Sequence, residues 1–299
     1  MPEYPDICIY VEKLKTLLSG ERLENFRVLN PFVLRSVSPS PAEFVDKKIV
    51  DFHRIGKRII FECEDEFFVV VHLMVAGRFH WKDRDKNVAR KVALAAFNFS
   101  KGTLWLTEAS TQKRASIHCV KGKENLSKFD RGGLEVMDAA FDEFRERLCS
   151  ENHTIKRSLT DPTLFSGIGN AYSDEILHRA RLSPILQSQK MTDEQIEQLF
   201  QATKDVLAEW TERLRKENED NFPEKVTAFH DKMAVHGKFG EPCPVCGTPI
   251  QRIRYASNET NYCSTCQTGG KILADRALSR LLKNDWPRSI EELEDRISE

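Results

Sequence analysis

Four of the eight cysteines form two CxxC pairs that are separated by sixteen residues. The pairs are Cys243 with Cys246 and Cys263 with Cys266. Each CxxC makes a tight turn that presents two sulfur atoms to one ion, and in a reduced compartment this spacing is a strong zinc signal. Four thiolates close a tetrahedral site without an open position, so we expect one structural Zn²⁺ and catalysis elsewhere. The alternative is two disulfides in a secreted protein.

A second candidate is the turn at residues 167–170, with the sequence GIGN, which interrupts a helical pattern. Gly167 and Gly169 allow the backbone to approach a ligand closely, and a new helix is expected to begin at Asn170. The N–H groups at a helix N-terminus bind phosphate. The turn therefore favours a phosphate site, and the alternative is an ordinary turn between two helices.

The first half of the chain predicts a β-rich domain with a helix at its N-terminus. Apolar residues share one helical face over residues 7–18, and short alternating or β-branched runs follow from about 24 to 120. Residues 58–73 predict two strands around a charged turn at 64–66. Further strands are expected at 92–99 and 103–107.

The second half follows a helical pattern from residue 134 onward. Asp161 and Pro162 predict a helix start, because proline is favoured at the first helical position. Another helix is expected from Asn170 to about residue 180. Thr192 and Gln195 form a capping box at the start of a long helix, whose apolar stripe runs to residue 214.

Charged segments follow the long helix. Residues 215–224 predict a mobile loop, and residues 272–299 predict a helical tail with a second capping box at Ser289 and Glu292. The last fifteen residues, 285–299, hold six acidic and two basic side chains, and the whole chain has a net charge of -1. This balance excludes a uniformly basic nucleic-acid coat, although a local basic face remains compatible with it.

The composition indicates a globular cytoplasmic protein. Hydrophobic residues make up 40% of the chain, which argues against disorder. The most apolar stretch, residues 67–77, is far too short to span a membrane. We expect no signal peptide, because the sequence MPEYPD at the start has no basic region followed by an apolar run. We therefore expect no membrane association.

Several motifs occur in a fixed order along the chain. They are MPEYP at the start, RIGKRIIF at 54–61, HLMVAGRF at 72–79, GIGNAYSDEILHRARLSP at 167–184, VHGKFGEPCPVCGTPI at 235–250 and NYCSTCQ at 261–267. No single motif decides the matter. The ordered set, which covers residues 2–270, resembles the formamidopyrimidine-DNA glycosylase / endonuclease VIII family.

The resemblance implies an α+β fold of two domains. An N-terminal helix and a two-sheet β-sandwich would precede a helix–two-turn–helix domain with a four-Cys zinc-finger hairpin, and DNA would lie in the cleft between the halves. On this basis we expect a catalytic domain at 1–125, a DNA-binding domain at 134–222, a zinc finger at 235–270 and an acidic helical tail at 271–299.

The resemblance also implies base excision, in which a damaged base is flipped out and removed and the strand is then nicked. We expect the damaged base to be an oxidised one. After removal of Met1, Pro2 would expose a secondary amine, and a pKa of ~8 leaves part of such an amine neutral near pH 7. The amine would form a Schiff base with the sugar and lead to β/δ-elimination. Glu3 would act as general acid/base, and Lys57 would contact a phosphate and assist the elimination.

Backbone phosphates of the damaged strand would be bound by Lys156 and Asn170, together with the turn that holds Gly167 and Gly169. Such contacts position DNA without reading its sequence.

The chain departs from the family pattern at the zinc hairpin and at the residues that fill the space of the flipped base. Asn258 stands where the family carries an arginine, and Arg252 and Arg254 are candidates to compensate. Val75 stands in place of the usual methionine, and the family's Pro-Arg-Arg-Phe run is missing, which leaves residues 112–114 as substitutes. An apolar wedge stabilises kinked DNA, so the identity of the wedge stays open.

Three functions remain in view. The first is a DNA glycosylase with lyase activity, acting as a monomer on damaged DNA. The second is a catalytically weakened relative that binds damaged or open DNA. The third is a zinc-stabilised interaction module whose acidic residues 285–299 bind a protein partner. We expect the protein to be located where the DNA is, which is the nucleoid in the cytoplasm of a bacterium and the nucleus in a eukaryote.

Overall fold

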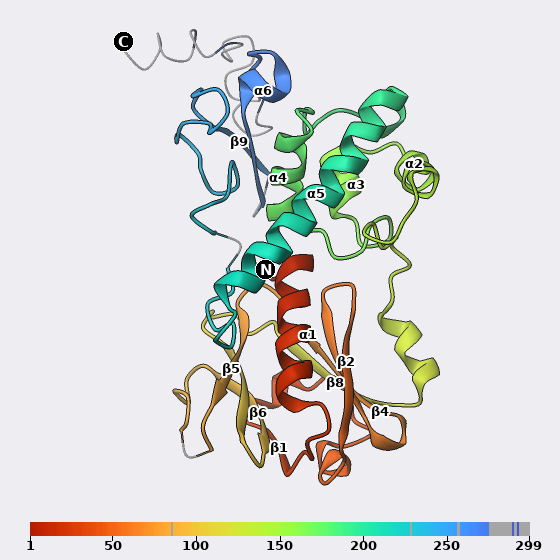
Figure 1. The fold of residues 1–299 in the computed structure, drawn as a ribbon, viewed down its shortest axis with the longest axis vertical. Helices are drawn as coiled ribbons and strands as arrows, with labels where there is room; N and C mark the ends of the chain where they lie inside the picture. The colour runs from red at the N-terminus through yellow and green to blue at the C-terminus, as the bar shows by residue number, and fades with distance from the viewer. Residues whose placement is uncertain (85, 228, 256–257, 275–288, 290–291, 293–299) are drawn as a thin grey trace. The chain divides into compact units, whose positions relative to one another are not determined.

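The structure is a computed structural model, and it describes the chain except residues 85, 228, 256–257, 275–288, 290–291 and 293–299. The chain divides into two compact units (Figure 1). We call them the N-terminal unit (Met1–Gly132 with Glu209–Ala228) and the C-terminal unit (Gly133–Ala208 with Phe229–Glu299).

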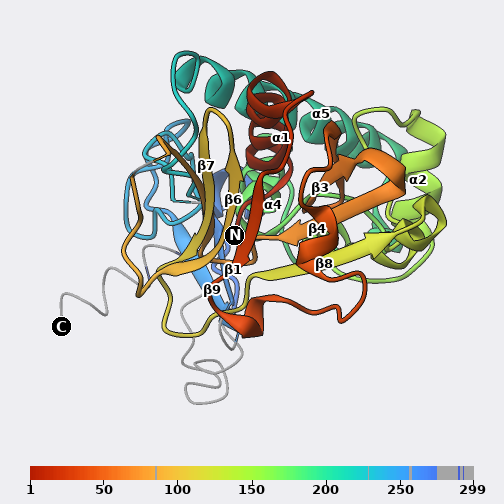
Figure 2. The ribbon, with the colours of Figure 1, turned by 90° about the horizontal axis from the view of Figure 1, so that it is seen from below.

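The described part of the N-terminal unit contains the first helix of the chain and two four-stranded antiparallel sheets (Figure 2). The helix is α1 (Tyr4–Leu18). One sheet has the strand order β1-β6-β7-β5 and the other β2-β3-β4-β8. The strands are β1 (Asn25–Val28), β2 (Ile49–Ile55), β3 (Arg58–Cys63), β4 (Phe67–His72), β5 (Gly77–Lys82), β6 (Ala93–Phe99), β7 (Gly102–Glu108) and β8 (Ser116–Lys121).

Aromatic side chains from both sheets form one core, which makes the two sheets a sandwich. The ring of Phe61 on β3 lies 5.2 Å from that of Phe97 on β6 and 5.9 Å from that of Phe79 on β5. Tyr10 of α1 meets the ring of Phe79 edge to face at 5.7 Å. All four side chains are buried, and each such burial stabilises the fold by about 1.5–3 kcal/mol. The expected β-sandwich with an N-terminal helix is confirmed.

The predicted strand pair around the charged turn is present as β3 and β4, which flank Glu64–Glu66. The N-terminal helix begins three residues earlier than the apolar pattern indicates. Pro5 lies in its first turn, and the Asp6 carboxylate accepts the backbone N–H of Glu3 at 2.8 Å. Proline and an acidic side chain both favour a helix start, so local chemistry extends the helix beyond its apolar stripe.

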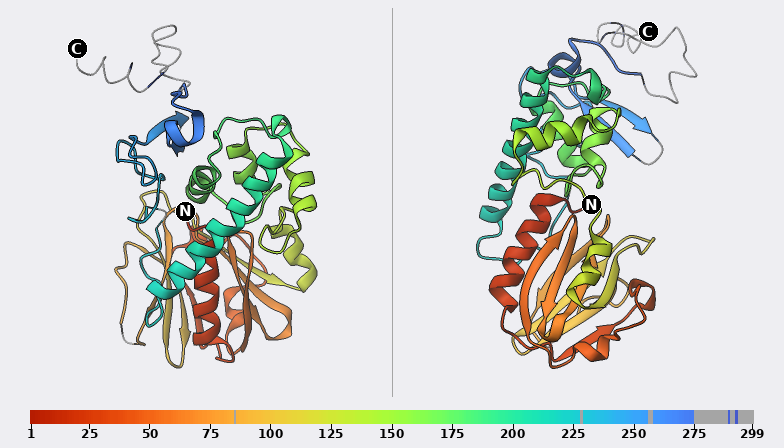
Figure 3. Two further views of the ribbon diagram at one scale, coloured as in Figure 1. Left: turned by 45° about the horizontal axis from the view of Figure 1, so that its top comes forward. Right: turned by 90° about the vertical axis from the view of Figure 1, so that its right-hand side faces the viewer.

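The C-terminal unit contains helices and a two-stranded hairpin (Figure 3). Phe144, Phe165 and Phe200 pack together in its core, with ring centroids 4.8 and 5.2 Å from Phe144. The elements are α2 (Phe141–Cys149), α3 (Ile155–Thr160), α4 (Asn170–Arg179), α5 (Asp193–Glu217), β9 (Gln251–Tyr255), β10 (Asn258–Tyr262) and α6 (Ser264–Thr268). Residues of α5 from Glu209 onward belong to the N-terminal unit.

The predicted helix start at Asp161 and Pro162 is wrong. Helix α3 ends at Thr160, and its start is capped by the side chain of Thr154. The Asp161 carboxylate accepts the N–H and the hydroxyl of Thr163 at 2.9 and 2.6 Å. An aspartate can bond to the backbone two residues ahead and so form a turn, and here that local bond replaces a helix cap.

Two other helix starts of this unit follow the prediction, whereas the helical pattern expected from residue 134 is wrong for its first turns, because α2 starts only at Phe141. Helix α4 begins at Asn170, and the capping box before α5 is present, with Thr192 and Gln195 exchanging hydrogen bonds of 3.1 and 3.3 Å. The predicted loop at 215–224 is partly helical, because α5 continues to Glu217. Beyond it, Glu224 forms an ion pair of 2.7 Å with Lys82 of β5, within the N-terminal unit.

The C-terminal tail is described only in part. Residues 271–274 are not helical. The backbone N–H of Glu292 donates to the Ser289 hydroxyl at 3.3 Å, which is one of the two bonds of the expected capping box. The rest of the predicted tail helix lies outside the described residues. Among the described helices, none is long and apolar enough to cross a membrane.

Candidate functional site

The two CxxC pairs meet in one cluster. The sulfur atoms of Cys243, Cys246, Cys263 and Cys266 all lie within 4.8 Å of one another. Cys243 and Cys266 are 3.9 Å apart, and Cys246 and Cys263 are 3.4 Å apart, measured between Sγ atoms. Tetrahedral zinc with Zn–S bonds of about 2.3 Å places sulfur atoms roughly 3.8 Å apart, so the cluster fits this ion. The predicted structural zinc site is confirmed.

A histidine that the sequence analysis did not single out lies beside this cluster. The Nε2 atom of His178, on α4, is 3.3 Å from the Sγ atom of Cys243. Burial lowers the pKa of His178, and the cations of Arg179 and Arg181 lower it further. Its position within the GIGNAYSDEILHRARLSP motif is the only hint in the sequence, since periodicity alone assigns it to a helix face.

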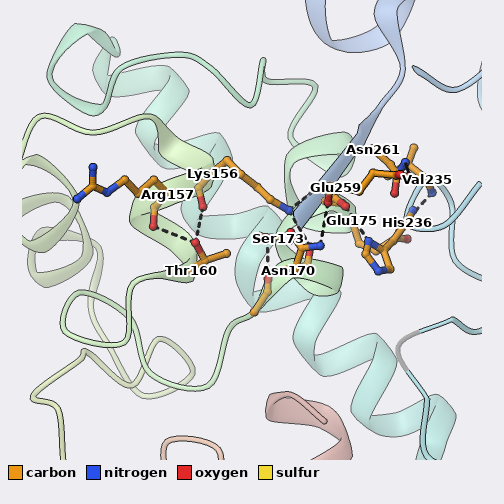
Figure 4. A network of polar contacts seen from close by, with 12 residues as sticks. Lys156, Arg157, Thr160, Asn170, Ser173, Glu175, Val235, His236, Glu259 and Asn261 are labelled. Carbon is orange, nitrogen blue, oxygen red and sulfur yellow. Dashed lines mark hydrogen bonds and ion pairs between the residues drawn. The ribbon is translucent and has the colours of Figure 1, made fainter. Parts of the chain in front are cut away.

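The start of α4 brings two predicted DNA-binding residues together (Figure 4). The Lys156 ammonium donates to the backbone carbonyl of Asn170 at 2.7 Å and to the Asp174 carboxylate at 2.5 Å. The Asn170 side chain donates to the backbone carbonyl of Glu259 on β10 at 2.8 Å. Gly167 has a φ of +80°, a conformation that favours glycine, and Gly169 is the N-cap of α4. The turn, α3 and the hairpin therefore meet at one place.

Two buried carboxylates on α4 fix the segment that precedes the zinc cluster. Glu175 accepts the backbone N–H groups of Ala234, Val235 and His236 at 2.8, 2.9 and 3.0 Å. Asp174 accepts a bond of 2.7 Å from the Nδ1 side of His236. Burial raises the pKa of Glu175, and the three backbone donors oppose that shift. These contacts cannot be predicted from the local sequence, because the partners lie about sixty residues apart.

The zinc hairpin carries positive charge that is partly neutralised internally. Arg252 and Arg254 lie 3.5 and 3.3 Å from the carboxylate of Glu259, measured from nitrogen to Oε2. The Arg252 guanidinium also lies 4.0 Å from the ring centroid of Phe239. Asn258 is the first residue of β10 and pairs with Tyr255 of β9. Both candidate arginines are therefore on the hairpin as expected, with a shared acidic partner.

The start of the chain places the predicted catalytic residues in a common environment. Pro2 and Glu3 are both buried immediately before α1. Lys57 follows Gly56 in the turn between β2 and β3, and Gly56 has a φ of +59°. Burial lowers the pKa of Lys57, and the charge of Glu3 opposes this effect. The Glu3 carboxylate and the Lys57 ammonium therefore interact, although 54 positions separate them in the sequence.

The same environment lowers the pKa of the chain's terminal amine. Burial is the main cause at Met1, Arg78 and Lys57 lower the value further, and Glu3 and Asp6 raise it. Asp6, which the sequence analysis did not single out, is fully buried, and burial raises its pKa to about 7. An amine with a lowered pKa is more often neutral at pH 7, and a neutral amine is a nucleophile.

The candidate wedge residues lie on two turns of the N-terminal unit. Val75, between β4 and β5, is 54% exposed. Residues 112–114 lie in the loop between β7 and β8, and Gln112 and Arg114 are exposed. The buried Glu108 carboxylate accepts the backbone N–H groups of Arg114 and Ala115 at 2.8 and 3.0 Å. These bonds attach the end of the loop to β7.

Three family models match consecutive parts of the chain. The formamidopyrimidine-DNA glycosylase N-terminal domain matches residues 1–114, the H2TH domain of the same glycosylase matches residues 133–218, and a zinc finger found in FPG and IleRS matches residues 240–269.

Curated relatives and solved structures agree with these models. A formamidopyrimidine-DNA glycosylase of Pelotomaculum thermopropionicum is 30% identical over 276 residues, which cover 89% of this chain and 99% of the relative. An uncharacterized formamidopyrimidine-DNA glycosylase-like protein of Mycobacterium tuberculosis is 40% identical over 151 residues, covering 50% of this chain and 94% of that protein.

A Lactococcus lactis FPG in complex with DNA containing Fapy-dG has a TM-score of 0.79 at 26% identity, and the match covers 89% of this chain and 100% of that one. The same enzyme bound to DNA with an AP site has a TM-score of 0.77 at 26% identity, with 89% and 99% covered. Sequence, fold and zinc cluster lead to one conclusion: this chain belongs to the formamidopyrimidine-DNA glycosylase / endonuclease VIII family, in the form with a C-terminal zinc finger.

Proposed function

We propose that this protein is a base-excision-repair DNA glycosylase with AP lyase activity. The observation that carries the proposal is the buried Pro2–Glu3 pair at the start of α1, within the electrostatic reach of Lys57. Oxidised bases are the proposed substrate class, because L. lactis FPG structures contain Fapy-dG DNA and DNA with an oxidised pyrimidine.

The reaction begins at Pro2 once Met1 has been removed. The lone pair of the Pro2 nitrogen forms a bond to the sugar C1′, the glycosidic bond breaks, and the base leaves with a proton. Burial at this place lowers the pKa of the terminal amine of Met1, and the same surroundings would favour the neutral form of the Pro2 amine. Glu3 supplies a proton to the sugar ring oxygen, which opens the ring and yields the iminium.

Strand cleavage follows from the iminium. Loss of a proton from C2′ drives breakage of the C3′–O bond and releases one phosphate, and loss of a proton from C4′ releases the other from C5′. The positive charge on nitrogen accepts the electron pair in both steps. Lys57, on the β2–β3 turn, is the proposed partner of the leaving phosphate, because its cation can offset the charge that develops on oxygen.

The C-terminal unit is the proposed source of most phosphate contacts. Asn170 and the amides of the 167–170 turn stand at the N-terminus of α4. Lys156 uses two of the three N–H groups of its ammonium on Asn170 and Asp174, which leaves one for a phosphate. Zinc holds the hairpin that carries Arg252 and Arg254, and it takes no part in the chemistry.

One observation favours the second candidate, a relative that binds damaged or open DNA without efficient excision. Glu259 pairs with both hairpin arginines, and Asn258 adds no charge. Fewer charged phosphate contacts reduce both the affinity for DNA and its salt dependence. We therefore also propose a preference for single-stranded, bubble or abasic DNA, where flipping a base costs least.

Borohydride trapping on an oligonucleotide with an abasic site tests the proposal. The chain with Met1 removed should form a covalent adduct, and a form in which Met1 is retained should not. Pro2→Gly, which keeps a primary terminal amine, is the matched control and should retain part of the trapping. Equal trapping by the Met1-retained form would move the nucleophile elsewhere, first to Lys57. No adduct with any form would favour the binding-only candidate.

Three further parts of the proposal concern the protein in the cell. We propose that it acts as a monomer, that it is located with the DNA in the nucleoid or nucleus, and that the acidic residues 285–299 bind a protein partner. Light scattering of the purified chain, with and without abasic DNA, tests the first part. A mass of two chains would contradict it.

A further inference from the structure

A buried histidine of α4 touches the zinc cluster. His178 is 7% exposed, and its Nε2 atom lies 3.3 Å from the Sγ atom of Cys243, which is itself 3% exposed. Hydrogen bonds to sulfur are longer than those to oxygen because the sulfur atom is larger, and this separation is within their range. The contact joins residues that are 65 positions apart in the sequence.

The direction of this hydrogen bond follows from the metal. A cysteine that coordinates zinc is a thiolate and has no proton, so it can only accept. The proton must therefore be on Nε2 of His178. The histidine is not needed as a ligand, because four sulfur atoms within 4.8 Å of one another already complete the tetrahedral set.

Other contacts attach α4 and the turn after it to the zinc module. The Gln267 side chain donates to the backbone carbonyl of Leu182 at 2.9 Å and accepts the N–H of Cys263 at 2.8 Å. Asn170 reaches the hairpin through the carbonyl of Glu259. The His178 contact differs from these because it ends on a sulfur that would bind the metal.

We propose that His178 is a positioning residue of the zinc site, donating from Nε2–H to the Cys243 thiolate. Four thiolates around one Zn²⁺ carry a net charge of -2, and a donor to sulfur spreads this charge and opposes protonation of the ligand. The bond slows the loss of zinc. It also couples the metal to the helix that begins at Asn170, and this second consequence rests on the proposed function of that residue.

The test uses the whole protein, loaded with zinc or with cobalt in its place. His178→Phe removes the donor and retains a ring, and His178→Gln restores an N–H donor on a side chain of similar reach. Leu177→Ala is the matched control, because it opens a cavity in the core at the neighbouring position of α4 and leaves the donor in place. The two readouts are the rate of zinc transfer to a chelator and the energy of the sulfur-to-cobalt charge-transfer band.

His178→Phe should release zinc about 10–100 times faster than the unchanged chain. Its cobalt band should move to lower energy, because the sulfur lone pairs are no longer stabilised by a hydrogen bond. His178→Gln should recover part of both effects, and Leu177→Ala should leave the band where it is. None of these readouts requires DNA, so a failure of the lyase proposal would not affect them.

Two results would overturn the proposal. In the first, the cobalt band of His178→Phe has the same energy as that of the unchanged chain, and His178→Phe releases zinc no faster than Leu177→Ala does. The other is a band in the unchanged chain with the intensity of three thiolates, which would make His178 a ligand. If His178→Phe does not fold, His178→Leu removes the donor in its place, and an unshifted cobalt band with zinc release no faster than in Leu177→Ala counts against the proposal.

Discussion

Glu175→Gln should loosen the segment that leads into the zinc module. The Glu175 carboxylate, on α4, accepts three backbone N–H groups, from Ala234 to one oxygen and from Val235 and His236 to the other. Glutamine has the same shape and keeps one oxygen. Its NH₂ group would face the N–H of one of these residues, and two donors cannot bond to each other.

The cost can be worked out from these bonds. A buried N–H left without an acceptor costs about 1–3 kcal/mol, and each of the other two bonds weakens by about 1 kcal/mol when the acceptor loses its charge. Relief from holding a buried carboxylate offsets part of this sum, since burial raises the pKa of Glu175. We expect a net loss of about 3 kcal/mol in the free energy of opening this segment, which corresponds to roughly a 100-fold change in its equilibrium constant.

Amide hydrogen exchange is the direct assay, because it reports local opening at residues 234–236 without requiring the whole chain to unfold in one step. Glu146→Gln is the matched control, since Glu146 is exposed on α2 in the same unit. Exchange at 234–236 should accelerate roughly 100-fold in Glu175→Gln and stay unchanged in the control. Equal exchange in the two variants would show that the three bonds contribute nothing and would refute the reasoning.

Three further predictions follow from other sites. Burial raises the pKa of Asp6 from 3.8 to about 7, so the folded chain with Met1 present holds a proton that the unfolded chain releases. The Asp6 contribution to the free energy of unfolding should therefore fall as pH rises from about 4 to about 7, and in urea titrations the stability difference between the unchanged chain and Asp6→Asn should decline over this range, whereas a difference that does not vary with pH would contradict the assignment. Cys246→Ser should lose zinc and DNA binding while the N-terminal unit stays folded, and metal analysis with circular dichroism would detect either a retained ion or a general collapse. Asn258→Arg should strengthen duplex binding and steepen the dependence of log K on log salt by about one, and an unchanged slope in anisotropy titrations would show that this position does not meet a phosphate.

Local patterns were sufficient for much of the fold. The alternation of apolar residues predicts the strands on either side of Glu64–Glu66, and the Thr192–Gln195 box predicts the start of α5. Both signals act between residues close in sequence, so they need no knowledge of the rest of the chain. The helix start predicted at Asp161 is wrong because the local sequence is ambiguous there. The Asp161 side chain can cap a helix or close a turn, and both structures use the same short-range hydrogen bond.

The zinc cluster was determined by the sequence alone, because a CxxC pair presents its sulfur atoms from one turn whatever surrounds it. The carboxylates of Asp174 and Glu175, the ring of His178 and the buried Asp6 were decided by the tertiary structure. The contacts of Asp174, Glu175 and His178 are made with residues about sixty positions away, and the pKa of Asp6 is raised mainly by burial. Neither the spacing of residues nor the composition shows which buried donor will meet a given acceptor. The charge of Glu3 affects the pKa of Lys57 only because the fold brings the two residues near each other. Burial strengthens this interaction, because charges are screened less away from water.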